Sequence, residues 1–258
     1  REIGRRRKRP DAAAAPAANA RRQGSLADGQ PGVTNSARAL HATQLTPDEV
    51  ERILRVCGTD ALLVGGQALA AWAVHYDIQP IGELSRAVTM DVDFIGTSDV
   101  AHALQRALGQ PWKLRKGTLD DGGGQVAKVY AKTMDGIKQV DFLSGIVGLD
   151  TEVVCKRATE VTLPDGVAVN VLHPLDVLES RLRNLDSIPA KRDATGVAQA
   201  RLAVSVVRAF IEDYMDGGND PRTVRQAVQR VEKIALDPRL AQVAFTYDVE
   251  VLAAIPVE

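Results

Sequence analysis

The chain is organised around an eight-residue stretch, Val88-Thr89-Met90-Asp91-Val92-Asp93-Phe94-Ile95. Apolar and polar side chains alternate along most of it, and a period of two is typical of a half-buried strand. One face is therefore apolar, and the other carries Asp91 and Asp93. Side chains two residues apart on a strand lie roughly 6–7 Å apart on one side, so both carboxylates can reach a single cation. An amphipathic strand that simply points two acids into water has the same pattern.

The segment upstream has the pattern of a strand followed by a helix. Its apolar run, Leu62 to Val64, breaks at Gly65 and Gly66 and resumes with helical spacing from Gln67. Paired glycines at such a junction let backbone N–H groups approach a ligand, and the helix N-terminus adds partial positive charge. The junction therefore predicts a phosphate-binding turn at Gly65, Gly66 and Gln67.

A second strand of similar design follows downstream. In Gln139-Val140-Asp141-Phe142-Leu143, the acid faces opposite to Val140 and Phe142. Three carboxylates on neighbouring strands repel one another unless a cation lies between them. We therefore predict that Asp91, Asp93 and Asp141 share a divalent metal site.

These three pieces resemble the DNA polymerase β-like nucleotidyltransferase superfamily, whose pattern is a Gly-Gly or Gly-Ser turn, an Asp-x-Asp strand and a later strand with a single Asp. The chain looks most like the AbiEii-type bacterial proteins, which include toxins of type IV toxin–antitoxin systems. The resemblance covers residues 62–143 and continues more weakly after His173. It implies an α+β fold, with a mixed sheet flanked by helices and followed by a C-terminal helical bundle.

The resemblance also implies an activity. It implies transfer of a nucleoside monophosphate from an NTP to a hydroxyl of RNA (the tRNA 3′ end), of a protein or of a small molecule. Asp91, Asp93 and Asp141 would be the catalytic residues and would hold two Mg²⁺ ions, for which Mn²⁺ can substitute. An antitoxin is an expected partner. Two alternatives stay open: a nucleotide-sensing or partner-binding protein without turnover, and a hydrolase that uses the same metals.

Four more residues are candidates for nucleotide binding. Arg86 lies in the loop before the acid strand, and Thr89 lies within that strand as a possible hydrogen-bonding neighbour of the acids. Arg181 and Asp193 fall in the helical region where related proteins carry a basic residue and an acid. The acids that usually follow the Arg-Asp pair are replaced by residues 194–198, which departs from the motif. For Arg86 and Thr89, an ordinary surface role is the alternative.

Bulk composition limits the class of protein. The chain has 258 residues, 45% hydrophobic and 25% charged, with a net charge of −1, so no global field indicates a nucleic-acid partner. Its two cysteines, Cys57 and Cys155, lack metal-ligand spacing, which favours a reducing cytoplasm. We expect no membrane partner, because no apolar run approaches the roughly 20 residues of a membrane span.

Three regions are expected. We predict that residues 1–40 form a basic, Ala- and Pro-rich tail, which is either a solvated leader or an arm that contacts nucleic-acid phosphates. We predict that residues 41–172 form the nucleotidyltransferase core. Its first helix would begin with a capping box at Thr46, and a hairpin would turn at Asp135-Gly136. Residues 173–258 predict a helical domain. Three lysines on the predicted core strands are interpreted either as phosphate-binding residues or as solvated side chains: Lys128, Lys132 and Lys138.

Overall fold

The computed structural model describes residues 43–79, 91–118, 124–162, 166–218 and 220–257. Its helices are α1 (Pro47–Cys57), α2 (Gly65–His75), α3 (Ser98–Leu108), α4 (Thr151–Lys156), α5 (Pro174–Ser187), α6 (Ala194–Asp216), α7 (Pro221–Leu236) and α8 (Pro238–Thr246), with short 3₁₀ turns η2 (Pro189–Lys191) and η3 (Val251–Ala254). Its strands are β1 (Leu62–Val64), β2 (Val92–Ile95), β3 (Lys113–Lys116), β4 (Gln125–Lys132), β5 (Ile137–Leu143), β6 (Thr159–Thr162) and β7 (Ala168–Val171).

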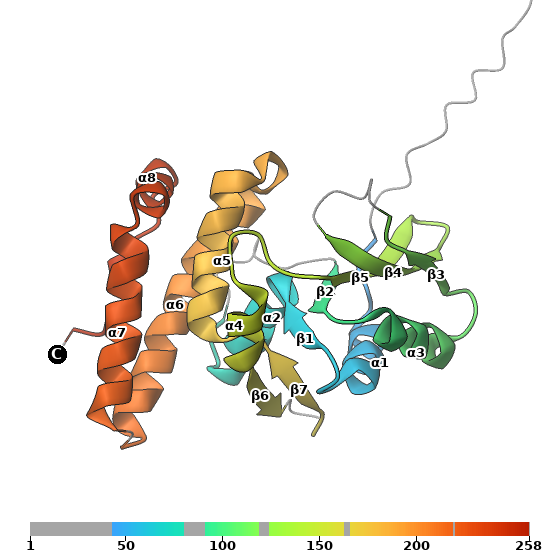
Figure 1. Ribbon diagram of the computed structural model, residues 1–258, viewed down its shortest axis with the longest axis horizontal. Coiled ribbons are helices and arrows are strands. Elements are labelled where there is room, and N and C mark those ends of the chain that lie inside the picture. The colour runs from blue at the N-terminus through green and yellow to red at the C-terminus, as the bar shows by residue number, and fades with distance from the viewer. Residues whose placement is uncertain (1–42, 80–90, 119–123, 163–165, 219, 258) are drawn as a thin grey trace, which may run out of the picture. The chain divides into compact units, whose positions relative to one another are not determined.

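The strands form one mixed sheet in the order β3-β4-β5-β2-β1-β7-β6. Two pairs are parallel, β2 with β5 and β1 with β7, and the other four neighbouring pairs are antiparallel. Parallel pairing places two strands that are distant in sequence side by side in the middle of the sheet. The predicted α+β class, with a mixed sheet, flanking helices and C-terminal helices, is confirmed (Figure 1).

The alternating pattern of β2 and β5 separates core side chains from polar ones. Val92, Phe94, Val140 and Phe142 are fully buried, and the two phenylalanine rings stack with centroids 5.6 Å apart. The residues between them point to the other face of the sheet and are half-buried. Burying the four apolar side chains fixes which face the acids occupy, because a one-residue slip would exchange the two sets.

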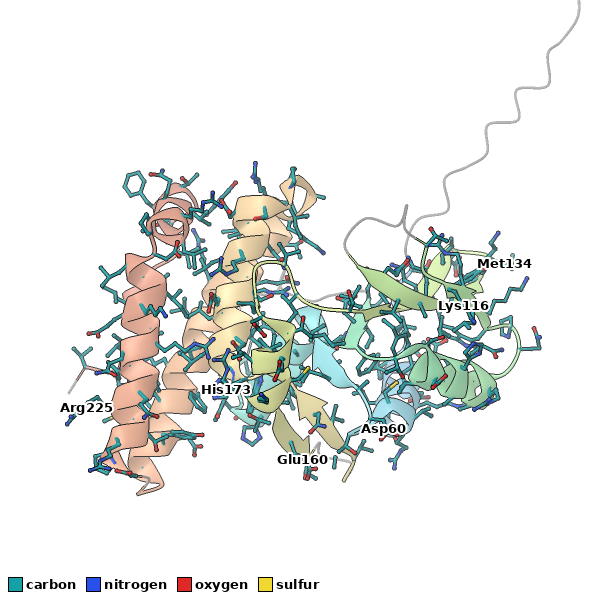
Figure 2. All side chains as sticks on the ribbon, in the orientation of Figure 1. Asp60, Lys116, Met134, Glu160, His173 and Arg225 are labelled. Atoms are coloured by element: carbon teal, nitrogen blue, oxygen red, sulfur yellow. The ribbon has the colours of Figure 1, made fainter. Side chains whose placement is uncertain are left out.

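The predicted start of the folded core is confirmed at α1. Thr46 accepts a hydrogen bond from the Glu49 amide, and the Glu49 carboxylate accepts one from the Thr46 amide, which completes a capping box. α1 packs against α3, and α3 packs against β3 and β4. The β4–β5 hairpin turns at Asp135-Gly136 as predicted, with Met134 fully exposed at its tip (Figure 2).

The C-terminal helices pack on one another and on α2. α5 contacts α6 and α6 contacts α7, and these three helices lie side by side, whereas α8 lies at the end of α7 and contacts both α7 and α5 (Figure 1). α6 is long and apolar enough to cross a membrane by length and composition, yet most of its apolar window is buried. Because α2 contacts both α5 and α6, the predicted division near residue 172 crosses packed surfaces and stays a prediction.

Several element boundaries differ from expectation. α2 begins at Gly65, two residues before the predicted start at Gln67, and β2 begins at Val92, so Asp91 immediately precedes the strand. Residues 88–90 of the predicted strand lie outside the described part of the chain, as does the basic tail. α4 was not predicted, although Asp150 is a recognisable N-cap that accepts from the Val153 amide.

Candidate functional site

One cross-strand row of residues places two of the three predicted acids together. Asp93 on β2 is the register partner of Asp141 on the parallel strand β5. The same row continues to Val64 at the end of β1 and to Lys128 on β4. Neighbouring strands lie about 4.8 Å apart, and partners in one row project to the same face. The sheet therefore brings Asp93 and Asp141 side by side, next to the strand that leads into α2.

The Asp93 carboxylate lies directly against the glycine turn. Gly65 has φ +69°, a conformation that side-chain-bearing residues rarely adopt, and it is the first residue of α2. A Cβ on Gly65 would overlap Oδ2 of Asp93 and lie 3.1 Å from both its Cβ and Cγ. The N-cap residue of α2, Val64, makes no side-chain capping hydrogen bond within the described part of the chain. Glycine is thus required at position 65 for two reasons: the positive φ angle disfavours any other residue, and the Asp93 carboxylate occupies the space that a Cβ would need.

Asp141 is held by polar side chains from its own strand and the neighbouring one. Gln125 donates to Oδ1, Gln139 donates to Oδ2 at 3.3 Å, and the Lys128 ammonium lies 3.3 Å from Oδ1. The sequence patterns did not identify the two glutamines as site residues. Gln139 could have been identified from the sequence, because it lies two residues before Asp141 and therefore on the same face of the strand.

Asp91, which is half-buried, completes an electrostatically coupled group of three acids. Burial, then the charges of Asp141 and Asp91, raise the pKa of Asp93 to about 6. Burial also raises the pKa of Asp141, with Asp91 adding to the rise while Lys128 opposes it. Such mutual repulsion is costly unless a cation offsets it.

Arg181 on α5 interacts electrostatically with this acid group. Its side chain is buried, and burial lowers its pKa, while the charge of Asp93 opposes that decrease. It donates to Gln199 at 3.0 Å and to Ser180 at 3.3 Å, and among the described residues its Nε has no hydrogen-bond partner. Exposed Lys191 also lowers the pKa of Asp93, and it was not among the predicted site residues. Two cations from the helical region therefore act on the acids of the sheet.

The other predicted residues have mixed placements. Gly66 is buried and Gln67 half-buried in the first turn of α2, whereas Arg86 and Thr89 lie outside the described residues. Asp193 caps α6 by accepting a hydrogen bond from the Gly196 amide at 2.8 Å. Its nucleotide-binding role stays a prediction.

The three core lysines do not all have the same environment. Lys128 is paired with Asp141, as described above, and Lys138 is paired with Glu49 at 2.7 Å. Neither is the freely solvated side chain that one interpretation of the sequence expected. Lys132 is exposed.

The donor set fits a hard divalent cation, because carboxylate oxygens are the ligands Mg²⁺ prefers. Burial and then the charges of Asp141 and Asp91 raise the pKa of Asp93, and a bound divalent ion would offset this repulsion between the acids. Within the described ranges, however, no three His, Cys, Asp or Glu side chains are close enough to form a ready-made metal group. Both Asp141 oxygens accept from protein donors, but among the described residues Oδ2 accepts from Gln139 alone, which leaves it a lone pair for a metal ion.

Two solved structures resemble the chain at low similarity. One is a protein from H. pylori described as a candidate nucleotidyltransferase, with a TM-score of 0.39 and 13% identity over 80% of this chain and 90% of that chain. The other is JHP933 from Helicobacter pylori, with a TM-score of 0.38 and 13% identity over 80% and 88% of the two chains. No protein-family model and no curated protein matches the chain. Similarity at this level establishes no shared activity, so the function has to be argued from the geometry of the site.

The raised pKa of Asp93 predicts a stabilising substitution. Its carboxyl binds a proton more tightly in the folded state, so its unfavourable contribution develops as the pH rises from 3.8 to about 6 and is complete above that. In metal-free buffer, Asp93→Asn should raise the free energy of unfolding by about 2–3 kcal/mol at pH 8 and leave it nearly unchanged below the lower value. Urea denaturation at the two pH values measures this difference.

Asp135→Asn is the matched control, because Asp135 is exposed in the β4–β5 turn. It should change the stability little at either pH. If Asp93→Asn were less stable than the wild type at pH 8, Asp93 would not carry the electrostatic cost described here.

Proposed function

We propose that the protein is a Mg²⁺-dependent nucleotidyltransferase that moves a nucleoside monophosphate from an NTP to a hydroxyl group. The observation that carries this proposal is the placement of Asp93 between Gly65 at the start of α2 and Asp141 on β5. A phosphate held at the glycine turn would thus lie beside a carboxylate pair. Phosphoryl transfer needs positioning and charge neutralisation more than covalent chemistry from the protein.

The glycine turn is assigned to the phosphate tail of the nucleotide. The first amides of α2, at Gly65, Gly66 and Gln67, are not bonded within the helix and carry its partial positive charge. The space that a Cβ of Gly65 would occupy is taken by the Asp93 carboxylate, so a phosphate held by these amides would lie beside that acid. The exposed Lys191 ammonium would add positive charge on the side of the C-terminal helices.

The three acids are assigned to the reacting centre. Asp91, Asp93 and Asp141 would hold Mg²⁺, which when bound neutralises the triphosphate and makes the attacking hydroxyl easier to deprotonate. Asp141 would accept the proton of that hydroxyl or orient it. The charge of buried Arg181 partly offsets that of Asp93.

The acceptor is proposed to be an RNA, with the tRNA 3′ end favoured by the AbiEii resemblance, and a protein or small-molecule hydroxyl as the other acceptors. The same resemblance is the ground for proposing a toxin with a partner antitoxin. The proposal includes the basic segment before residue 41 as a candidate RNA-binding arm. That segment lies outside the described residues.

The test uses the purified full chain with each labelled NTP, Mg²⁺ and total RNA, in parallel with Asp93→Asn and the exposed control Asp135→Asn. Labelled RNA or self-labelled protein should form with the wild type and the control. Product should fall to background with Asp93→Asn, because the carboxylate that ligates the metal beside the glycine turn is lost.

Two other outcomes would reject transfer. Saturable NTP binding without any labelled product would favour the alternative, a nucleotide-sensing or partner-binding protein on the same fold. Release of free monophosphate or phosphate, with no labelled acceptor, would indicate a hydrolase. Chelation with EDTA should abolish transfer, and full activity in EDTA would contradict the assignment of the three acids.

A further inference from the structure

A second site lies among the C-terminal helices, separate from the acid group. A cleft of about 490 Å³ is bounded by the turn before α4, by α4 itself, and by α5, α7 and the start of α8. Glu179 and Arg183 of α5 line it. Each residue of a helix turns by about 100°, so Arg181, which acts on Asp93, lies nearly opposite to both. The cleft therefore occupies the other side of α5 from the proposed active site.

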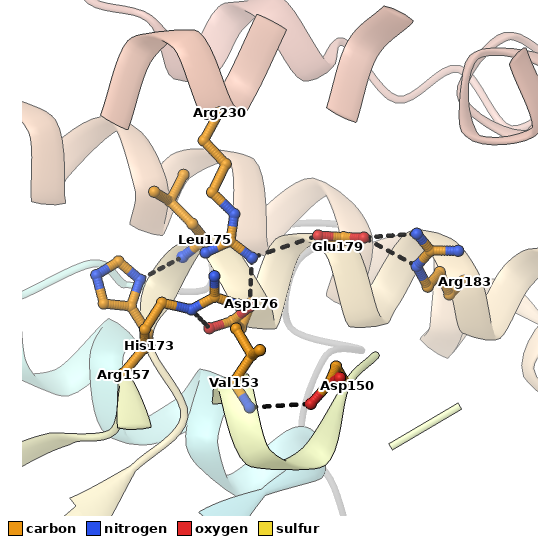
Figure 3. Close-up of polar contacts among 9 residues, drawn as sticks. All are labelled: Asp150, Val153, Arg157, His173, Leu175, Asp176, Glu179, Arg183 and Arg230. Atoms are coloured by element: carbon orange, nitrogen blue, oxygen red, sulfur yellow. Dashed lines mark hydrogen bonds and ion pairs between the residues drawn. The ribbon is translucent and has the colours of Figure 1, made fainter. Parts of the chain in front are cut away.

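The acids around this cleft already have partners (Figure 3). Asp176, fully buried, accepts two hydrogen bonds from Arg157, at 3.0 and 2.6 Å, and another from Arg230. Glu179 accepts from Arg183 at 3.0 and 2.6 Å and from Arg230 at 3.3 Å. Both carboxylates are thus already engaged in ion pairs with arginines of the protein.

The remaining two acids of the lining are caps of helices. Asp150 accepts from the Val153 amide at the start of α4, and Asp237 accepts from two amides at the start of α8. A carboxylate in this position is partly neutralised by the helix it caps. His173, whose pKa burial lowers to about 4, adds no charge at neutral pH and caps α5 through Nδ1.

The cations of the cleft, in contrast, keep unused donors. Arg157 and Arg183 each bond through Nε and Nη2 only, which leaves Nη1 of each without an acceptor among the described residues. Within the described ranges, Arg230 bonds through Nη2 alone. The Lys233 ammonium, exposed at the rim, has no acceptor in the part of the chain that the structure describes. The cleft therefore offers several N–H donors, beside two carboxylate oxygens, Oδ2 of Asp150 and Oδ2 of Asp237, that accept no hydrogen bond among the described residues.

We propose that this cleft binds the phosphate group of a small phosphorylated molecule. Three guanidinium groups and an ammonium, from different elements, supply more N–H donors than the two oxygens of a ligand carboxylate can accept. A phosphate group has at least three acceptor oxygens and therefore matches these donors better. The cleft is also larger than a lone phosphate, and Leu149, Val153, Ile234 and Leu240 give it an apolar part. The ligand is thus expected to carry a less polar body attached to its phosphate.

Calorimetric titration of the full chain at constant ionic strength, in EDTA, tests this site with two probes, inorganic phosphate and a nucleoside monophosphate. Lys233→Gln and Arg183→Gln should each raise the Kd of the tighter probe about tenfold, since each removes a charge-assisted hydrogen bond. Lys132→Gln, an exposed lysine on β4, is the matched control and should bind like the wild type. Circular dichroism of each variant checks that its fold is intact.

Asp93→Asn separates this proposal from the proposed function. It should leave metal-free binding of both probes unchanged while nucleotidyl transfer is lost. Saturable binding of either probe that depends on Lys233 and Arg183 supports the cleft, and tighter binding of the monophosphate identifies a nucleotide-like body. The proposal is overturned if neither probe saturates, if both cleft variants bind like the wild type, or if binding disappears with Asp93→Asn.

Discussion

Gly65→Ala is expected to reduce nucleotidyl transfer about a hundredfold, the typical effect of displacing a reacting group by about 1 Å. The added methyl would occupy the position of the Asp93 carboxylate, so Asp93 must shift or α2 must move. The conformation at φ +69° would also strain an alanine by about 1–2 kcal/mol. Steady-state kinetics of transfer, together with urea denaturation, measures both effects.

Gly109→Ala is a close control for this substitution. Gly109 has φ +68°, nearly the same backbone angle, and a Cβ there would meet no atom within 4 Å. It should therefore lose a similar amount of stability to backbone strain and retain activity. Equal activity losses in the two variants would show that strain, and not contact with Asp93, accounts for the effect at Gly65.

Asp176→Ala should lower the free energy of unfolding by about 3 kcal/mol, the range found when one partner of a buried ion pair is removed. Asp176 is fully buried and joins Arg157, after α4, to Arg230 on α7 (Figure 3). Without it, two partly buried guanidinium groups lose their principal acceptor. Chemical denaturation at neutral pH is the direct measurement.

Glu212→Ala gives the matching exposed case. Glu212 forms an ion pair with Arg208 at 2.9 Å one helical turn away on α6, and both side chains are nearly half exposed. Removing it should cost about 0.5 kcal/mol or less. A comparable loss for the two variants would mean that the Asp176 network contributes little to holding α4, α5 and α7 together.

Local patterns in the sequence predicted much of the architecture. Alternation along β2 and β5 identified the core phenylalanines and the opposite, acidic face, because burial of one face is a property of the strand itself. Capping chemistry located α1, where Thr46 precedes a proline at the first helical position. The Asp-Gly pair located the β4–β5 hairpin.

Contacts between distant segments could not be predicted in the same way. Nothing local indicates that Asp93 pairs in register with Asp141, that Gln125 and Lys128 would contact Asp141, or that Asp176 would be buried between two arginines. These contacts depend on which strands become neighbours and on how α5 packs, and both follow from the tertiary fold. α4 was missed because its six residues are too few for a periodic pattern to be recognised.

The row formed by Val64, Asp93, Asp141 and Lys128 also limits which changes in chain length the protein can tolerate. An insertion at the exposed residues Met134 and Asp135 of the β4–β5 turn leaves the row intact, since a surface loop absorbs added residues at small entropic cost. A single residue gained or lost inside β2 or β5 would rotate every later side chain to the other face and send a carboxylate into the phenylalanine layer. Homologues that share this chemistry should therefore differ in length at the turns and keep the spacing between each acid and its flanking phenylalanine.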